Sequence, residues 1–280
     1  MLGYGPTTLN NLSPPLISAM PSIKSFSHLL IASLIALLLL GGCATTELPS
    51  NKWSAEKFYQ EAQKSLKISD FESAIKNFED LEVHHPFSPY TQQAQLEVAY
   101  AYYKYDEPDS ALAALDRYIK LYPRADNVDY AYYLRGLVSM ERGTSSFDLW
   151  LGLDTTKRQP QTFKNAFSYF KDLINRYPNS EYSLDAKQRM VALRNHLAAY
   201  ELHAADYYMR RGAYLSAANR AKYVLENYPQ TPATPDALAI LAEAYQQLGI
   251  QDLADNALEV LKLNFPNHKT IAKLGESSTS

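Results

Sequence analysis

Hydrophobic positions of this chain recur at helical spacing in a frame of fifteen residues that ends at a proline. In the clearest copy the apolar side chains fall at offsets 0, 3, 4, 7, 10, 11 and 14, and Pro178 follows: Phe163, Ala166, Phe167, Phe170, Leu173, Ile174 and Tyr177. These offsets place every apolar side chain on one stripe of an α-helix, and the proline removes the next backbone donor. The pattern predicts an amphipathic helix that packs through one face.

The same repeat frame occurs five times, before Pro86, Pro123, Pro178, Pro229 and Pro266. Offset 3 is always alanine, and offset 14 is always a ring. A small residue at a fixed position lets a second helix approach closely, and a ring can close the end of that contact. The residues at these two offsets are Ala74, Ala111, Ala166, Ala217 and Ala254, then His85, Tyr122, Tyr177, Tyr228 and Phe265.

The spacing of the prolines gives the repeat length. Successive prolines are 37, 55, 51 and 37 residues apart, which indicates a unit of 37 with 18 extra residues in the third copy and 14 in the fourth. Such a unit resembles the tetratricopeptide repeat, a helix-turn-helix of 34 residues. The first helix of the motif favours a small residue followed three positions later by tyrosine, as in Ala99 and Tyr102. We therefore predict an all-α solenoid of five tetratricopeptide-like repeats over residues 53–268, at about 54–88, 89–125, 126–179, 180–231 and 232–268.

Two copies depart from the unit. The third is interrupted by Gly143–Pro160, whose apolar residues around Trp150 indicate a loop that either folds back on the solenoid or offers a docking patch. The fourteen extra residues of the fourth copy are about four helical turns, so they keep the apolar stripe nearly in phase. Ser180–Arg211 is predicted to be one long helix or two nearly collinear ones, and residues 269–280 a flexible tail.

The N-terminal 42 residues are typical of a signal peptide. Leu29–Leu40 is apolar and uncharged, too short to span a membrane, and Lys24 supplies a positive flank before it. Leu40-Gly41-Gly42-Cys43 then resembles the bacterial lipobox, which would make Cys43 the lipidated first residue of the mature protein and 43–52 a linker. Met20 is a possible true start. The alternative is that Cys43 is a buried free thiol.

The sequence contains few groups that indicate chemistry. The formal net charge of −3 does not favour nucleic acid as a partner, and the single cysteine excludes an internal disulfide framework. There is no glycine-rich phosphate loop and no paired-cysteine spacing. His196 and His203 are seven residues apart, but no carboxylate or cysteine stands beside them at ligand spacing. We predict no catalytic residue, no metal and no cofactor.

Tyrosines gather in the first helices of the second and third repeats, including Tyr102, Tyr103 and Tyr105. A tyrosine ring offers an apolar body and a hydrogen-bonding tip, which suits peptide binding. We therefore place a peptide groove at these three residues. The alternative is that most of these rings only pack between helices.

With the lipobox, the repeats and the long fourth-repeat helix in view, the chain resembles the BamD family, the tetratricopeptide-repeat lipoproteins of the outer-membrane β-barrel assembly machine. The resemblance covers nearly all of residues 53–268. Its most specific segments are Asp129–Gly136 (DYAYYLRG) and the long helix, supported by Phe71–Leu81, Tyr177–Ala186, Tyr200–Ala213 and Asn219-Arg220.

The resemblance implies a scaffold, not an enzyme, anchored to the outer membrane and facing the periplasm. Later repeats would hold the last POTRA domain of a BamA-like barrel subunit, with Arg220 at the contact. Earlier repeats would receive the C-terminal segment of unfolded outer-membrane proteins, and a BamC-like lipoprotein would lie over the surface. The main alternative is a lipid-anchored pilotin for a pilus secretin, which shares the anchor and the repeats.

Overall fold

The structure, a computed structural model, describes residues 52–142 and 160–277. The chain divides into two compact units, Met1–Lys52 and Trp53–Ser280, and all helices discussed below belong to the second. Within the described ranges there are eleven α-helices and no strands. They are α2 (Ala55–Lys67), α3 (Phe71–His84), α4 (Thr91–Lys104), α5 (Pro108–Leu121), α6 (Val128–Arg142), α8 (Gln161–Arg176), α9 (Ser183–Arg210), α10 (Tyr214–Asn227), α11 (Thr234–Gln247), α12 (Gln251–Asn264) and α13 (Thr270–Ser277).

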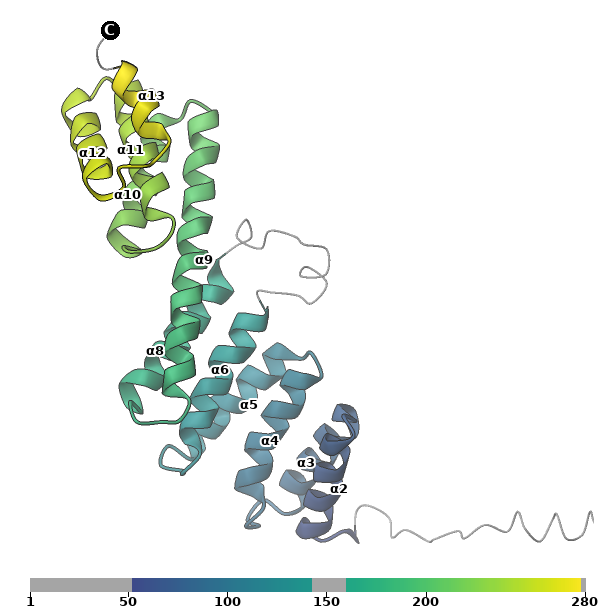
Figure 1. Cartoon of the computed structure of the whole chain (residues 1–280). Coiled ribbons are helices and arrows are strands. Elements are labelled where there is room, and N and C mark those ends of the chain that lie inside the picture. Colours follow the sequence, from purple (N-terminus) through teal and green to yellow (C-terminus); the bar gives the residue numbers. More distant parts are fainter. Residues whose placement is uncertain (1–51, 143–159, 278–280) are drawn as a thin grey trace, which may run out of the picture. The chain divides into compact units, whose positions relative to one another are not determined.

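The helices stack in pairs, each packing mainly on its neighbours in the sequence (Figure 1). The pairs α2/α3, α4/α5, α6/α8, α9/α10 and α11/α12 are the five predicted repeats. First helices of successive repeats also touch, as in α2 with α4, α4 with α6, and α9 with α11. First helices therefore share one face of the stack. The prediction of an all-α repeat fold is confirmed.

The repeat frame describes the packing well. The alanines at offset 3 are all buried, four of them completely, and the leucine or phenylalanine stripes pack around them. The rings at offset 14 are the C-cap residues of α3, α5, α8, α10 and α12. The last helical residue of each lies two positions before the proline, because the residue that directly precedes a proline disfavours the helical conformation.

In the third repeat a glycine takes the place of the small first-helix alanine. Gly136 of α6 is buried against the ring of Phe170 from α8, and a Cβ atom built on it would lie 2.3 Å from Cε1 of that ring. No side chain fits at that distance, so α6 and α8 pack closely only with glycine there. The alanine pattern of the other first helices did not reveal this position, although it lies 37 residues after Ala99.

The extra residues of the fourth repeat form a single helix. Helix α9 has 28 residues and so extends about 42 Å at 1.5 Å per residue. The predicted flexible tail from residue 269 was wrong for Thr270–Ser277, which form α13 and contact α11 and α12. The interruption at 143–160 lies, except for Pro160, outside the described residues, and so does the predicted signal and lipidation segment.

Candidate functional site

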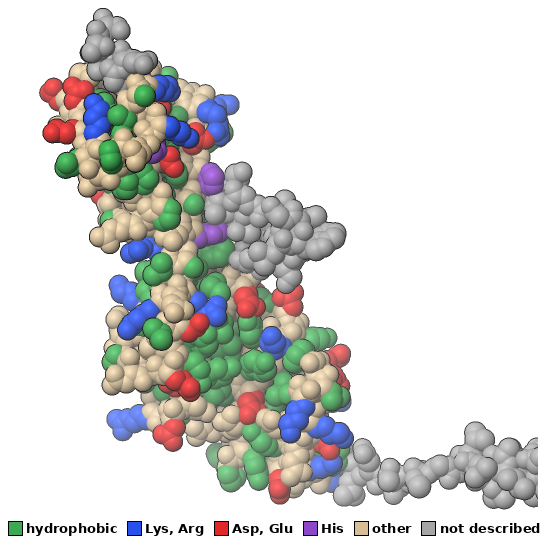
Figure 2. Space-filling model, viewed as in Figure 1, with side chains coloured by type: hydrophobic (Ala, Val, Ile, Leu, Met, Phe, Trp, Pro, Cys, Tyr) green, Lys and Arg blue, Asp and Glu red, His purple; other side chains and the backbone are tan. Residues whose placement is uncertain are grey.

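A line of tyrosines follows the shared face of the first helices across the first three repeats and into α9. Neighbouring rings lie close enough to interact, with centroids 5.4 Å apart for Tyr130 and Tyr182 and 5.0 Å apart for the stacked Tyr133 and Tyr182. Such pairs add to the free energy of packing beyond the area they bury. We call this set the tyrosine ladder: Tyr59, Tyr100, Tyr103, Tyr130, Tyr133 and Tyr182. Figure 2 shows hydrophobic side chains gathered over α4 and α6.

Several hydroxyls of the tyrosine ladder donate hydrogen bonds to carboxylates. Tyr133 donates to Asp185 Oδ2 at 2.6 Å, and Arg189 Nε donates to the same oxygen at 2.5 Å. Tyr103 donates to Glu141. Because these rings come from α4 and α6 and the acceptors from α6 and α9, the hydrogen bonds tie successive first helices together.

Glu97 is the centre of the polar network at the N-terminal end of the ladder. Its carboxylate accepts from Tyr59 Oη at 3.0 Å and Gln93 Nε2 at 2.8 Å, and also from Gln63. Burial raises the pKa of Glu97 above its usual value, although these donors oppose the shift. Burial, with Glu97 beside it, raises the pKa of Tyr59 to about 12, so this hydroxyl stays a donor at neutral pH.

A groove of about 350 Å³ opens beside Glu97. Two of its tyrosines, Tyr100 and Tyr130, are half-buried, and their hydroxyls have no hydrogen-bond partner among the described residues. The groove therefore combines apolar ring surface with two hydroxyls that are open to a ligand, whereas the amides of Gln63, Gln93 and Asn127 hydrogen-bond to the protein. Its lining residues are Gln63, Leu66, Gln93, Leu96, Glu97, Tyr100, Asn127, Tyr130 and Tyr182.

The three tyrosines predicted from the sequence do not line this groove. Tyr102 donates its hydroxyl to Glu79 of α3, so it packs against the second helix of the preceding repeat. Tyr103 belongs to the ladder through Glu141, and Tyr105 is the exposed C-cap of α4. Tyr102 and Tyr103 point apart because successive residues of a helix are rotated by about 100°, and Tyr105 lies just past the last residue of α4.

Glu97 was not predicted from the sequence, and Tyr100 and Tyr130 belong to the predicted tyrosine-rich first helices but were not among the three residues chosen for the site. Helical periodicity could have indicated these residues, because positions 97, 100 and 130 lie on the face of α4 and α6 that turns toward the neighbouring first helices. The repeat motif directed attention to Tyr102 instead. That motif position is a packing position in this chain, as its contact with Glu79 shows.

Arg220 lies on α10 and faces α9. Its Nη1 donates to Glu201 Oε2 at 2.8 Å, and the side chain of Glu201 is only 4% exposed whereas that of Arg220 is 45% exposed. The hydrogen bond to Glu201 raises the pKa of Arg220. The guanidinium thus neutralises a buried carboxylate and still presents part of its surface to solvent.

Some of the histidines pack against aromatic rings. His196 lies 4.0 Å from Phe163 and His84 lies 5.6 Å from Phe58, measured between ring centroids. In residues 52–142 and 160–277 no group of three or more histidine, cysteine or acidic side chains is placed to hold a metal ion. None of the helices in those ranges has the length and apolarity needed to cross a membrane.

Comparison with known proteins identifies the family. A family model described as YfiO, outer membrane lipoprotein, matches residues 51–261. The outer membrane protein assembly factor BamD of Xylella fastidiosa is 41% identical over 250 residues, which cover 89% of this chain and 85% of that protein. The chain belongs to the BamD family of outer membrane lipoproteins.

Other BamD relatives agree. The BamD protein of Neisseria meningitidis serogroup A is 43% identical over 235 residues, covering 82% of this chain and 88% of the relative. Among solved structures, PilW, a type IV pilus biogenesis factor, aligns over 90% of this chain and 92% of its own with 14% identity and a TM-score of 0.33. That likeness is too weak to carry an argument, so the BamD relatives decide between the two alternatives raised by the sequence.

Proposed function

We propose that this chain is an outer-membrane protein assembly factor that works as a scaffold without enzymatic activity. It is anchored to the outer membrane by lipid on Cys43 and faces the periplasm. It binds the C-terminal segments of unfolded outer-membrane proteins, holds the POTRA region of a BamA-like barrel subunit, and accommodates a BamC-like lipoprotein. Membership of the BamD family supports this proposal.

The groove beside Glu97 is the main support for the client-binding part of this proposal. An extended peptide needs partners for its backbone N–H and C=O groups, because a buried polar group without a hydrogen bond costs free energy. The hydroxyls of Tyr100 and Tyr130 are open, and the ladder rings offer flat apolar surface for alternate side chains of such a segment. We therefore move the client site from Tyr102, Tyr103 and Tyr105 to this groove.

Titration of a fluorescent client peptide into the detergent-extracted, full-length protein tests the proposal. The peptide should end in a strand of alternating aromatic and polar residues. Replacing Tyr100 and Tyr130 together by alanine should weaken binding about thirtyfold or more, which corresponds to the loss of about 2 kcal/mol expected of a binding hot spot. Replacing both by phenylalanine should cost less, because only the hydroxyls are lost.

The matched control is Tyr105→Ala, which removes an exposed ring of α4 outside the groove. It should leave peptide affinity unchanged, and recovery of a POTRA domain should persist in all variants. Native affinity in the Tyr100/Tyr130 alanine variant would place the client elsewhere. Loss of both peptide and POTRA binding would mean that the stack had unfolded.

The barrel-subunit contact is assigned to the fourth and fifth repeats, with Arg220 as its charged residue. Support comes from the exposed part of the Arg220 side chain on α10. A guanidinium with open donors can bind a second carboxylate from a partner while it holds Glu201.

A further inference from the structure

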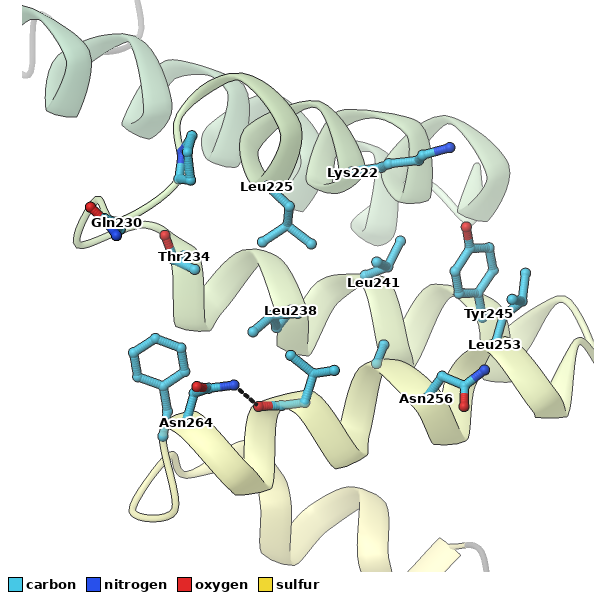
Figure 3. Close-up of a pocket in the computed structure, with 14 residues that line it drawn as sticks. Lys222, Leu225, Gln230, Thr234, Leu238, Leu241, Tyr245, Leu253, Asn256 and Asn264 are labelled. Carbon is cyan, nitrogen blue, oxygen red and sulfur yellow. Dashed lines mark hydrogen bonds between the residues drawn. The ribbon is translucent and has the colours of Figure 1, made fainter.

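A second groove, larger and more apolar, lies in the fourth and fifth repeats. Its volume is about 780 Å³, and its walls come from α10 and α12 with α11 as the floor (Figure 3). Leu238 and Leu241 of the floor are buried, while Val260 and Leu253 on the α12 wall are 44% and 43% exposed. Apolar side chains therefore line a groove that is open to solvent.

The residues that line this groove differ from those at the same repeat positions in the first two repeats. Pro86 and Pro229 are 143 residues apart, and so are Pro123 and Pro266, so the first two repeats superpose in register on the last two. At the positions that correspond to Leu225, Leu238 and Val260, the first two repeats have Glu82, Gln95 and Arg117.

In the first two repeats those three residues form a polar bridge across the same seam. Arg117 Nη2 lies 3.0 Å from Glu82 Oε2, and Gln95 Nε2 donates to Glu82 Oε1 at 2.8 Å. Helices α3 and α5 are thereby joined over α4. In the last two repeats every member of the bridge is replaced by an aliphatic residue, so nothing polar joins α10 to α12 there.

The tyrosine next to the bridge has lost its acceptor as well. In the first two repeats Tyr102 donates a hydrogen bond to Glu79. In the last two repeats Tyr245 corresponds to Tyr102, and Lys222 corresponds to Glu79. An ammonium group cannot accept a hydrogen bond, so Lys222 and Tyr245 both offer donors at one end of the groove, although Lys222 Nζ also lies 3.6 Å from Glu226 Oε1 on its own helix. The lining thus has an aliphatic middle and a donor-rich end.

We propose that this groove binds an amphipathic helix of a protein partner. The middle of the groove has no side-chain polar group to satisfy an extended backbone, and a helix satisfies its own backbone hydrogen bonds. The walls are fourteen-residue helices, about 21 Å long, which a helix can follow with aliphatic side chains at positions i, i+3, i+4 and i+7. A carboxylate on the partner would meet Lys222 and Tyr245.

This surface is distinct from the contact assigned to Arg220. Arg220 faces Glu201 of α9, whereas the groove is formed by α10, α11 and α12. The proposal therefore does not depend on the role of Arg220. The two surfaces can be disrupted separately.

A graft of the polar bridge provides the test. The variant Leu225→Glu, Leu238→Gln, Val260→Arg copies into the last two repeats the three residues that close the seam in the first two. The single variant Val260→Arg, at an exposed position, serves if the triple variant fails to fold. Leu263→Arg is the matched control, because Leu263 is an 80% exposed residue of α12 that does not line the groove.

The occupant can be identified by placing a photoreactive amino acid at position 241 or 260 of the full-length chain. The variant is made in cells that contain no other copy of the protein, and the crosslinked peptide is identified by mass spectrometry. We expect crosslinks to a segment with helical aliphatic spacing and a carboxylate at one end. The graft should reduce crosslinking from position 241 about tenfold or more, and Leu263→Arg should leave it unchanged. Crosslinks to a second copy of this chain, to a segment with alternating apolar and polar residues or to lipid would overturn the proposal. Crosslinking yields from positions 241 and 260 that are no higher than the yield from position 263 would also overturn it.

Discussion

The ion pair between Arg220 and Glu201 should contribute to the stability of the fold. Its contribution must be measured before Arg220 is used as a probe of partner binding. Glu201 is buried in α9, and the only cation that the structure pairs with it in the described residues is Arg220 of α10. Replacing Arg220 by alanine leaves a buried carboxylate without its charged partner. Replacing it by glutamate adds a second carboxylate at the same place.

The magnitude follows from the exposure of the two side chains. A buried group left without its partner typically costs about 1–3 kcal/mol. Because the Arg220 side chain is 45% exposed, solvent screens part of the attraction, and we expect Arg220→Ala to cost about 1–2 kcal/mol. Arg220→Glu should cost about 1 kcal/mol more, since two carboxylates at close range repel. For a chain of this size each kcal/mol lowers Tm by about 2–4 °C.

Denaturant unfolding of Arg220→Ala, Glu201→Gln and the double variant measures the coupling. Glu201→Gln removes the charge and keeps the shape, so Arg220→Ala should cost less in that background. Lys222→Ala, two residues further along α10 and 58% exposed, is the control and should be nearly neutral. Additive costs in the cycle, or an Arg220→Glu variant as stable as the native protein, would refute the reasoning.

The result also decides how the POTRA contact is tested. A loss of POTRA recovery in Arg220→Glu alone could come from a loosened α9–α10 pair. In the Glu201→Gln background the buried charge is absent, so Arg220→Glu there tests the partner contact more directly. Unchanged recovery in that background would remove Arg220 from the interface.

Three further predictions concern other parts of the chain. Cys43→Ala should abolish acylation and leave a precursor that keeps residues 1–42, and mass spectrometry of the membrane-extracted N-terminus checks this; an unmodified Cys43 in native protein would contradict it. Ala166→Leu should lower the free energy of unfolding by about 1–3 kcal/mol, because Ala166 is completely buried, and an unchanged melting curve would count against the repeat frame. Glu97→Gln should stabilise the protein at neutral pH: burial raises the pKa of Glu97, so its ionised form is disfavoured in the folded state, and the gain should vanish as the pH falls below the usual glutamate pKa near 4.5. Denaturation midpoints at pH 7 and pH 4 test this last prediction, and a gain independent of pH would contradict it.

The repeat fold was readable from the sequence because it rests on local signals. Alanine at offset 3 and a ring before each proline mark helix packing and helix ends, and both are repeated five times in register. The long α9 could also be predicted, since fourteen residues keep the apolar stripe in phase. Helix α13 was missed because Thr270–Ser277 is short and carries no repeat signal.

The site was harder to predict because it depends on contacts between repeats. Glu97 gathers donors from α2 and α4, and Tyr130 meets Tyr182 from α9, fifty-two residues away in the chain. Single-helix periodicity does not tell which tyrosine of a cluster meets which neighbour. The motif tyrosine Tyr102 was chosen for its register, and its contact with Glu79 turns it away from the groove.

The client site proposed beside Glu97 can be tested by a structure of the full-length protein with a bound client C-terminal peptide. We predict that the peptide is extended along the first helices, with backbone hydrogen bonds to the hydroxyls of Tyr100 and Tyr130 and side chains against the tyrosine ladder. A peptide bound beside Tyr102 and Glu79, or away from the first three repeats, would contradict it.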